Sequence, residues 1–576
     1  MNIVMKKNVR YGLNGSFVGT LGQPANYGGS FNINYRKNKT NLIASYGLSY
    51  RKGPGKGNSR QEYNSADTSF VYEQISSRNR GGLSNNFTVG MDYFINNQNT
   101  LTTTVSYRHS KNKNKSTLEY RDYDFQNTLT QTVIRNEIEE EPRINFEAAV
   151  AYKKTFEKKG QNLSMDFKYI LSDETESANF NQYVVGSDNT LLQRSINTED
   201  EKNILFQADY VHPFSEIGKF ETGFKGSIRQ LDNNFSVDQQ DEFQQWNVLP
   251  DFDNYLTYNE RIYAAYIMAS EKFGKIAAQA GLRGELSDIE TELKKTNVGN
   301  RRTYFNVFPS VHLSYELDKK QTLQLSYSYR LSRPGFRNLL PFSNFSDSRV
   351  FRSGNPLLNP EYTHSFEAGH LINMDKGTLL SSVYYRRRTG VIEYLTSVDS
   401  TGFTRITPVN LSTGDSYGLE FNLSYDLAKW WKLNTNANLF RSINEGRFND
   451  QLLKSDTYSW NSRLTSKVTI FKNIDFQTSL NYQAPRKTTQ GRTLAMYVVD
   501  LGFARDIFKG NGTVTLGIRD LFNSQKRRSI VENLGYYSKS EFQWRTRQAL
   551  LTVSYRLNRS KESQKPDNGG NFGEDD

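Results

Sequence analysis

Apolar and polar residues alternate with a period of two along most of the chain, which is the pattern of strands with one apolar face. In Gln321–Leu331 the odd-numbered positions from 323 onward are leucine or tyrosine, and the even-numbered positions from 324 onward are glutamine, serine or arginine. Leu163–Tyr169 and Leu419–Leu427 alternate in the same way. No stretch shows a competing helical period, so the pattern predicts an all-β protein.

Applied to the whole chain, the pattern predicts about 22 strands, with ends good to a few residues. The predicted strands are Arg10–Leu21, Gly28–Arg36, Asn41–Tyr50, Asn85–Ile95, Asn99–Arg108, Arg143–Lys153, Gln161–Leu171, Lys202–Val211, Gly218–Gln230, Tyr258–Lys272, Lys275–Ser287, Tyr304–Leu317, Gln321–Leu331, Glu361–Ile372, Gly377–Arg387, Ser416–Leu427, Trp431–Ile443, Thr457–Ile470, Asp475–Ala484, Leu494–Ala504, Gly512–Asp520 and Arg547–Leu557.

The connections between these strands alternate between short and long. The short ones are built from turn residues, such as Lys37-Asn38-Lys39 and Asp318-Lys319-Lys320. The other set is mostly long and polar, as in Arg51–Ser84, His109–Pro142, Ser172–Glu201 and Ser332–Pro360. Bacterial transmembrane barrels have this form, with short turns on one side of the membrane and long loops on the other. A soluble sandwich or propeller has no reason to sort its connections in this way.

The strand dimensions also fit a membrane. A strand of about ten residues rises about 33 Å, and a tilt near 45° reduces this to about 23 Å. That height matches the apolar band of an outer-membrane barrel, which is about 25 Å tall. Tyrosines at strand ends are expected to form the aromatic girdles at the two membrane surfaces: Tyr35, Tyr50, Tyr107, Tyr152, Tyr425 and Tyr482.

The polar face of the strands is expected to line a wide interior. With strands about 4.8 Å apart and tilted about 40°, the backbone diameter is on the order of 40 Å. Side chains from the wall cannot fill that space, so we expect either an open channel or a plug from another domain. Charged residues predicted to face this lumen are Arg108, Asp166, Lys168, Arg330, Glu420 and Asp426. The apolar face, including Leu323, Leu325 and Tyr327, is expected to meet lipid.

Composition supports an ordered protein and excludes several classes. Apolar residues make up 36% of the 576 residues and the mean hydropathy is −0.71, but aromatics reach 13%, which is unlike a disordered chain. No apolar run approaches the roughly 18 residues of a spanning helix. Cysteine is absent, which excludes disulfides and thiolate metal sites. The net charge of +12 is spread thinly, so solvated strand ends near anionic lipid headgroups explain it without nucleic acid.

One stretch carries a resemblance to a known family. It reads Tyr329-Arg330-Leu331-Ser332-Arg333-Pro334, then Ser353-Gly354-Asn355-Pro356, then Asn359-Pro360-Glu361, and it ends in Phe366-Glu367-Ala368-Gly369. Together with Asp520-Leu521-Phe522-Asn523 and the last predicted strand, it resembles the outer-membrane β-barrel family allied to TonB-dependent receptors. The resemblance covers Arg10 to Leu557. The prolines end one strand, and Glu361 opens the next, so we expect the motif loop (Arg333, Pro334, Gly354, Asn355, Pro356, Pro360 and Glu361) to have a structural role rather than to bind ligand directly.

The resemblance implies uptake of a nutrient or siderophore-like substrate across the outer membrane of a Gram-negative cell. It also implies long loops outside the cell, both termini in the periplasm, and partners that include outer-membrane lipid, lipopolysaccharide, the barrel-assembly machinery and a small-molecule ligand. Relatives carry a signal peptide and an N-terminal plug that engages TonB. Because the first strand begins near Arg10 and Met1–Lys7 precedes no apolar segment, we interpret this chain as the barrel portion of a truncated gene product or fragment. We therefore assign residues 1–557 to the barrel and Asn558–Asp576 to a disordered polar tail.

Two alternative functions remain open from the sequence. A barrel without a plug would act as a passive pore, and a barrel with long binding loops would act as a surface adhesin or assembly protein. An enzyme is not expected. Gly414-Asp415-Ser416-Tyr417-Gly418 matches the G-x-S-x-G string but leads into a strand rather than a helix. The five histidines have no metal-binding spacing, and the acidic run Glu137–Glu141 faces the basic run Lys111–Lys115 across one predicted loop. We therefore predict no cofactor, no metal and a self-paired surface loop.

Overall fold

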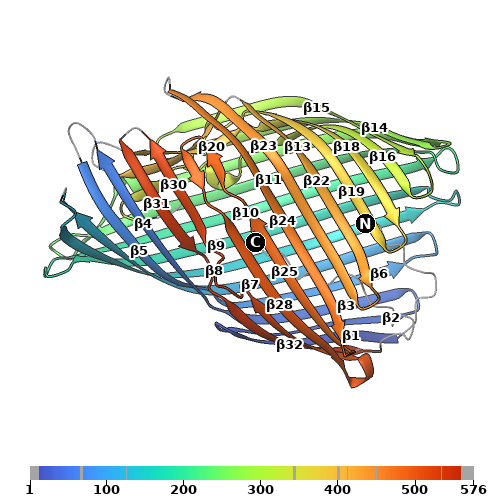
Figure 1. Cartoon of the computed structure of the whole chain (residues 1–576), viewed down its shortest axis with the longest axis horizontal. Helices are drawn as coiled ribbons and strands as arrows, with labels where there is room; N and C mark the ends of the chain where they lie inside the picture. The colour runs from blue at the N-terminus through green and yellow to red at the C-terminus, as the bar shows by residue number, and fades with distance from the viewer. Residues whose placement is uncertain are drawn as a thin grey trace.

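The computed structural model describes residues 12–64, 69–124, 126–340, 345–398, 403–411, 413–448, 451–471, 473–533 and 535–558. Within them, 22 antiparallel strands form a closed barrel wall (Figure 1). The wall strands are β1 Gly12–Gln23, β2 Asn26–Lys37, β3 Thr40–Arg51, β6 Gly82–Phe94, β7 Asn99–Tyr123, β8 Leu129–Thr155, β9 Asn162–Val184, β10 Thr190–Pro213, β11 Lys219–Gln240, β13 Asn254–Phe273, β14 Ile276–Leu293, β15 Val298–Glu316, β16 Gln321–Ser332, β18 Glu361–Met374, β19 Gly377–Thr389, β22 Thr413–Ala428, β23 Trp431–Phe448, β24 Gln451–Ile470, β25 Ile474–Gln483, β28 Met496–Ile507, β29 Gly512–Arg519 and β32 Gln548–Leu557.

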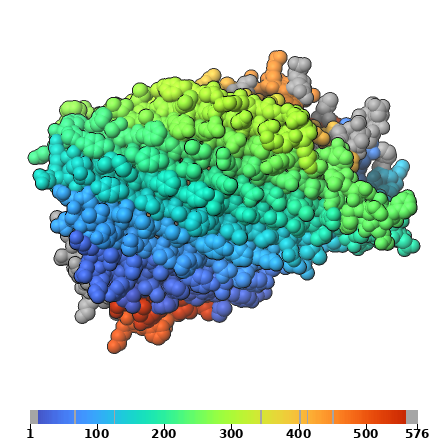
Figure 2. Space-filling view, turned by 180° about the vertical axis from the view of Figure 1, so that it is seen from behind, coloured from blue at the N-terminus to red at the C-terminus, as the bar shows by residue number. Residues whose placement is uncertain are grey.

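The barrel closes where the first wall strand meets the last. β1 pairs with β32 in antiparallel register, with Gly15 opposite Leu557 and Gln23 opposite Ala549. Seen from behind, the wall is continuous, and the red C-terminal residues lie directly beside the blue N-terminal ones (Figure 2). Closure leaves no unpaired edge in the membrane, which is what makes a spanning sheet possible in lipid. No helix among the described residues is long and apolar enough to cross a membrane.

The predicted strands are confirmed, but their lengths are not uniform. At the end of the barrel that carries the short turns, hereafter the short-turn end, the observed strand ends agree with the predicted ones to within a few residues. At the opposite, long-hairpin end, several strands run much further than predicted: β7 reaches Tyr123 instead of Arg108, and β9 reaches Val184 instead of Leu171. The predicted loops His109–Pro142 and Ser172–Glu201 are therefore mostly strand, and the loop prediction there was wrong. The alternation of apolar residues marks only the part of a strand that contacts lipid. The backbone pairing between strands continues beyond the membrane, where this alternation is lost.

The outward side chains mark the membrane band. Leu323 and Leu325 are 41% and 56% exposed on the outside of β16, as predicted for residues that meet lipid. The predicted girdle tyrosines occupy two levels of the wall. Tyr35, Tyr152 and Tyr425 lie near the short-turn end, and Tyr50, Tyr107 and Tyr482 lie where the predicted strands end on the other side. Two such levels bracket the apolar band, as expected for residues that prefer the membrane surface.

Short hairpins extend part of the wall at the long-hairpin end. They are formed by β4 Gly53–Asn64 with β5 Ser69–Arg80, β26 Arg486–Thr488 with β27 Gly491–Thr493, and β30 Arg527–Asn533 with β31 Tyr536–Gln543. These strands hydrogen-bond in the order β7, β5, β4, β31, β30, β27, β26, so that they continue the rim (Figure 1). The predicted loop Arg51–Ser84 is thus largely the β4–β5 hairpin. β12 Trp246–Val248 and the 3₁₀ turn η1 Pro250–Phe252 connect β11 to β13.

Two connections turn inward instead of extending the wall. Strands β16, β18, β19 and β22 are short, and the segments between them carry the 3₁₀ turn η2 Phe336–Asn338 and the strands β17 Val350–Arg352, β20 Ile392–Val398 and β21 Thr404–Asn410. These three strands form a separate small sheet in which β21 pairs with both of the others. A further 3₁₀ turn, η3 Phe508–Gly510, lies between β28 and β29. Apart from Asn558, the predicted tail lies outside the described residues.

Candidate ligand-binding lumen and inner lid

The barrel encloses a large polar cavity. Its volume is about 2550 Å³, and wall residues from both halves of the chain line it together with residues of the inward segments. Arg108, Ser110 and Asn112 face it from β7, and Asp426 and Lys432 face it near the short-turn end. The prediction that Arg108 and Asp426 point into the lumen is confirmed. A cavity of this kind can hold a small polar molecule in contact with many hydrogen-bonding groups.

The inward segments form what we call the inner lid, defined as residues 333–340, 345–360, 390–398 and 403–411. Its apolar side chains pack against the inner face of the wall. Phe336 and Leu340 lie in a buried cluster with Leu231, Leu256 and Tyr258 of β11 and β13. In a second cluster the lid contributes Phe345, and the wall contributes Ala178, Phe180, Phe235 and Val237. The lid is therefore held by ordinary core packing, and it occupies part of the lumen that we expected to be open or filled by another domain.

A buried arginine of the wall fixes one part of the lid. Arg135 of β8 is 1% exposed. Its guanidinium donates to the carbonyl oxygens of Phe345 (3.0 Å) and Ser346 (3.2 Å) in the lid, and to Gln193 Oε1 on the wall (2.8 Å). It also lies over the ring of Phe180, 4.3 Å from the ring centre. Burial lowers the pKa of this guanidinium, but the carbonyl oxygens around it compensate its charge.

A second arginine, this one from the lid, fastens the same segment to the wall. Arg349 forms a two-pronged ion pair with Asp122 of β7, with Nη2 2.9 Å from Oδ2. Its guanidinium lies between the rings of Tyr72 (4.9 Å) and Tyr120 (4.6 Å). The Tyr120 hydroxyl donates to Oδ1 of Asp347 in the lid (2.8 Å). Burial raises the pKa of Tyr120, which keeps the phenol neutral and able to donate. Charged and aromatic contacts thus converge on residues 345–349.

The motif loop predicted from the sequence lies in this lid. Arg333 directly follows β16 and forms an ion pair with Glu285 of β14, and its Nη2 donates to Ser287 Oγ (2.6 Å). Pro334 follows it, and β16 ends at Ser332, as predicted. The Gly354 amide donates to the Leu340 carbonyl oxygen (2.7 Å). A Cβ at position 354 would lie 2.2 Å from that oxygen, so only glycine fits this close approach.

The remaining motif residues connect different parts of the lid. Asn355 donates its amide N–H to the Asn338 carbonyl oxygen (2.6 Å) and its side-chain amide to the Pro408 carbonyl oxygen (3.2 Å). The Pro356 carbonyl oxygen accepts from Asn300 Nδ2 (3.1 Å). Pro360 is buried, and Glu361, the first residue of β18, accepts the Ile392 amide. These contacts are structural in kind, and the structural role of the motif stays a prediction.

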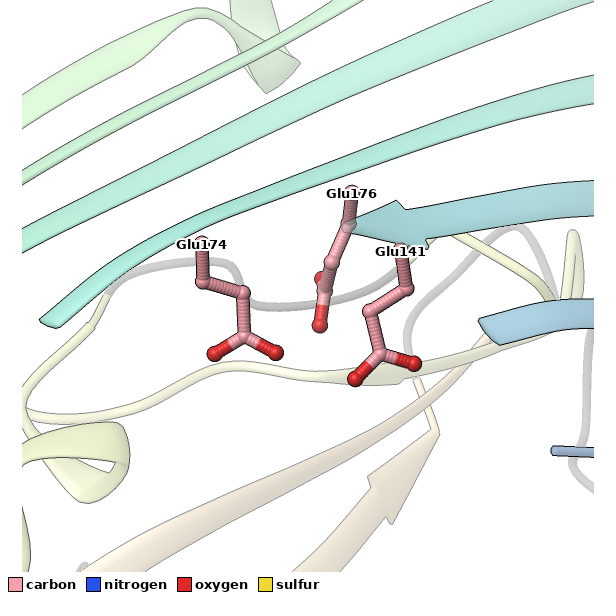
Figure 3. Close-up of side chains that lie close together, drawn as sticks. All are labelled: Glu141, Glu174 and Glu176. Carbon is pink, nitrogen blue, oxygen red and sulfur yellow. The ribbon is translucent and has the colours of Figure 1, made fainter. Parts of the chain in front are cut away.

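Three carboxylates gather on the inner face of β8 and β9. Glu141, Glu174 and Glu176 point toward one another, and ligand atoms from the three lie within 4.8 Å of one another (Figure 3). Arg143 Nη1 lies 3.3 Å from Glu174, and Asn197 donates to Glu176 (3.1 Å). Oxygen ligands of this kind suit a divalent cation, but acidic groups also gather without one. We therefore retain the prediction that the chain has no metal.

Glu139, next to this cluster, gives a pH-dependent prediction. Burial raises its pKa from 4.5 to about 7, although Asn114 Nδ2 donates to it (2.7 Å). Because the folded pKa lies above the unfolded one, this site is most stabilising below about pH 4.5, and stability is lost as the pH rises through about 7. We expect hydrogen exchange in the β8–β9 hairpin, corrected for intrinsic rates, to be slower at pH 5.5 than at pH 8. Glu139→Gln should reduce this difference; an unchanged difference would exclude Glu139 as its cause.

The remaining candidate residues from the sequence analysis lie in wall strands. Ser416 lies within β22, and β23 follows that strand, so its surroundings are not those of a nucleophile elbow. Glu140 pairs with Lys113 (3.0 Å) and Lys111 (3.7 Å), as the self-paired loop predicted. Glu137 and its inward neighbours instead bond to polar residues such as Ser116 (2.7 Å), because alternate residues of a strand face opposite sides.

A comparison with models of protein families assigns the chain to one family. A model described as "Outer membrane protein beta-barrel family" matches residues 154–555. The chain belongs to this family. This membership places it in the outer membrane and agrees with the resemblance carried by the motif loop. A comparison with curated proteins finds no significant match.

Solved structures with a similar fold are outer-membrane transporters and receptors. A structure titled "Copper transporter OprC" matches with a TM-score of 0.64 and 12% identity, covering 95% of this chain and 81% of that one. The ferripyoverdine receptor of Pseudomonas aeruginosa matches with 0.62 and 11%, covering 96% and 73%. The ferric yersiniabactin uptake receptor FyuA from Yersinia pestis matches with 0.62 and 12%, covering 95% and 80%. At these identities the likeness establishes the fold of this family member.

The sequence analysis did not identify the wall residues that hold the lid, although the positions of apolar residues along the long strands mark them. Along β7 the apolar residues Val105 and Tyr107 are odd-numbered and face outward, whereas Leu118 and Tyr120 are even-numbered and buried inside. The apolar residues therefore change from the outward face of the strand to its inward face, at the point where the strand leaves the lipid and begins to contact the lid. β11 shows the same inversion, from outward Phe224 to inward Leu231.

Proposed function

We propose that this outer-membrane barrel is a gated receptor for uptake of a small-molecule substrate. The observation that supports this most directly is the inner lid over a polar cavity of about 2550 Å³. Lid residues bond to wall and rim elements around the barrel, including Asn444 of β23, Gln61 of β4 and Gln490 between β26 and β27. A segment anchored across the lumen narrows it, which favours a gated receptor over an open passive pore.

The orientation and partners follow as parts of the proposal. We propose that the long-hairpin end faces the outside and that the ends of the described chain, which both lie at the short-turn end, face the periplasm. The barrel then contacts outer-membrane lipid and lipopolysaccharide, and it is inserted by the barrel-assembly machinery. A plug domain and TonB are partners if the native polypeptide carries a segment upstream of Met1. The titles of similar structures name copper, ferripyoverdine and yersiniabactin, which supports uptake of a small ligand.

Comparing native cells with and without this gene tests the proposal. We expect cells with the gene to deplete at least one small compound from the medium faster than the deletion strain does, as followed by mass spectrometry. The chain contains no cysteine, so Glu137→Cys/Ser346→Cys places one thiol on the wall and one on the lid, which a short bis-methanethiosulfonate reagent can link. After this linkage the variant should lose uptake, and reduction should restore it. Equal depletion by both strains, with loss only of surface attachment in the deletion strain, would favour the adhesin alternative.

A further inference from the structure

Four arginines on one side of the lumen lack an acidic partner among the described residues. Arg51 ends β3, Arg80 ends β5, Arg519 ends β29, and Arg545 lies just before β32. They come together because the barrel closes between β32 and β1 and because the β4–β5 hairpin returns to the same rim. All four line the large cavity, as does Trp544.

The surroundings leave this arginine cluster positively charged. Burial lowers the pKa of Arg545 most, and the charges of Arg51 and Arg519 lower it further, so these three guanidinium groups lie near one another. Arg80 lies near the carboxyl of Glu139, whose pKa its charge lowers, but no ion pair joins the two. The nearby Asp520 is 3% exposed, and its carboxylate already accepts the backbone amides of Ser524 (2.8 Å) and Gln525 (3.0 Å). These bonds hold the carboxylate in the turn, and among the described residues no ion pair joins it to an arginine of the cluster.

Neighbouring residues add to the positive charge and to the shape of the site. Lys52 directs its ammonium group to the carbonyl oxygens of Gly81 (2.8 Å) and Lys113 (2.6 Å), so it too lacks a carboxylate partner among the described residues. Trp544 is 55% exposed, and the Arg80 guanidinium lies 5.4 Å from its ring centre. An open indole beside several guanidinium groups offers an apolar surface bordered by anion-binding donors.

Several arginines that fasten the wall and the lid are paired with acidic residues. Arg229 pairs with Glu201 (2.7 Å), Arg333 with Glu285, and Arg349 with Asp122. Those pairs satisfy the charges within the wall and the lid. Other arginines that line the cavity, such as Arg108 and Arg463, share with the cluster the lack of an ion pair among the described residues, and the cluster differs from them in that several guanidinium groups gather in one place. Several guanidinium groups that lie near one another and line a large cavity can bind an anion, because each guanidinium group matches the oxygens of a carboxylate or phosphate with two parallel hydrogen bonds.

We propose that the arginine cluster, defined as Arg51, Arg80, Arg519 and Arg545, binds the carboxylate or phosphate groups of the small molecule that this barrel takes up. This inference rests on the proposed uptake function and narrows its substrate to anionic compounds. The cluster faces the cavity rather than the lipid, so the phosphates of lipopolysaccharide are not its ligand. Trp544 contacts the apolar part of the bound molecule.

Isothermal titration of the full chain in detergent, at low ionic strength, tests the proposal with citrate and inorganic pyrophosphate as probes. We expect wild type to bind at least one probe and Arg519→Gln/Arg545→Gln to bind it roughly tenfold or more weakly, because charged hydrogen bonds are lost. Arg463→Gln, which removes a lumen arginine of β24 outside the cluster, is the matched control and should bind like wild type. Arg519→Lys/Arg545→Lys keeps the charge and should fall between the two. Heat-modifiable migration on gels verifies that each variant forms the barrel.

The outcomes separate this proposal from the uptake function. Wild type that binds neither probe, or a loss of the same size in Arg463→Gln, overturns the anion site. Release of a co-purifying acidic polypeptide by the double glutamine variant also overturns it, because the cluster would then bind a plug. If that variant loses anion binding but native cells carrying it take up substrate at the wild-type rate, the substrate assignment fails and uptake stands. If binding is lost as expected but no compound depends on the gene for uptake, the uptake function fails instead.

Discussion

Replacing Leu325 by arginine should lower the free energy of unfolding by about 2–4 kcal/mol, the cost of a basic residue near the bilayer midplane. Leu325 lies in the middle of β16 and is 56% exposed on the outer face. Its cross-strand neighbours Leu313 and Ala368 are apolar or small, so an arginine would find no partner there. Equilibrium unfolding in lipid vesicles, followed by tryptophan fluorescence, measures the change.

The adjacent position supplies the control. Ser326 points to the lumen, and its cross-strand neighbours are His312 and Glu367. An arginine at 326 would reach water and the Glu367 carboxylate, so Ser326→Arg should change the folding free energy much less than Leu325→Arg. If the two substitutions are equally costly, the assignment of faces in β16 is wrong, and the lipid-facing wall with it.

Removing the two arginines that anchor the lid should have the second large effect. Arg135→Ala/Arg349→Ala deletes the donors to Phe345 and Ser346 and the ion pair with Asp122. Hydrogen bonds to charged groups contribute roughly 1.5–3 kcal/mol each, so their combined loss is on the order of 5 kcal/mol. A loss of this size favours states in which residues 345–352 leave the wall. We expect cells carrying this variant to become sensitive to bulky antibiotics.

A wall arginine outside the lid controls for general damage. Arg194 of β10 pairs with Asp238 (2.7 Å) and contacts no lid residue through that pair. Arg194→Ala should leave antibiotic sensitivity unchanged while removing a comparable ion pair. Sensitivity that rises equally in both variants would mean that the effect comes from a weakened barrel. Unchanged sensitivity in the double variant would mean that the lid does not close the lumen.

The alternation of residues was sufficient to predict the barrel because lipid imposes it. In β16 the predicted Gln321–Leu331 and the observed Gln321–Ser332 nearly coincide, since both ends of this strand lie close to the membrane surface. In β7 the prediction stopped at Arg108, because Lys111 and Lys113 face outward into water and interrupt the apolar face. The strand continues there through backbone pairing and inward packing, and neither leaves a hydrophobic signature on the outer side.

The lid could be predicted only in part. Pro334 and Glu361 marked where the wall strands end and resume, and the structure agrees. That the segment between them folds into the lumen depends on contacts such as Arg349 with Asp122, which are 227 residues apart in the sequence. Local patterns cannot specify such a pair. The arginine cluster was missed for the same reason, because Arg51 and Arg545 meet only after the first and last wall strands have paired.

The conductance of the purified wild-type chain in planar lipid bilayers tests the gated barrel most directly. The lid predicts membranes that stay electrically quiet after insertion, whereas Arg135→Ala/Arg349→Ala inserted under the same conditions should conduct steadily. A large, steady, weakly selective conductance from wild type would contradict a lid that closes the lumen, and the passive pore would then be the better account of this barrel.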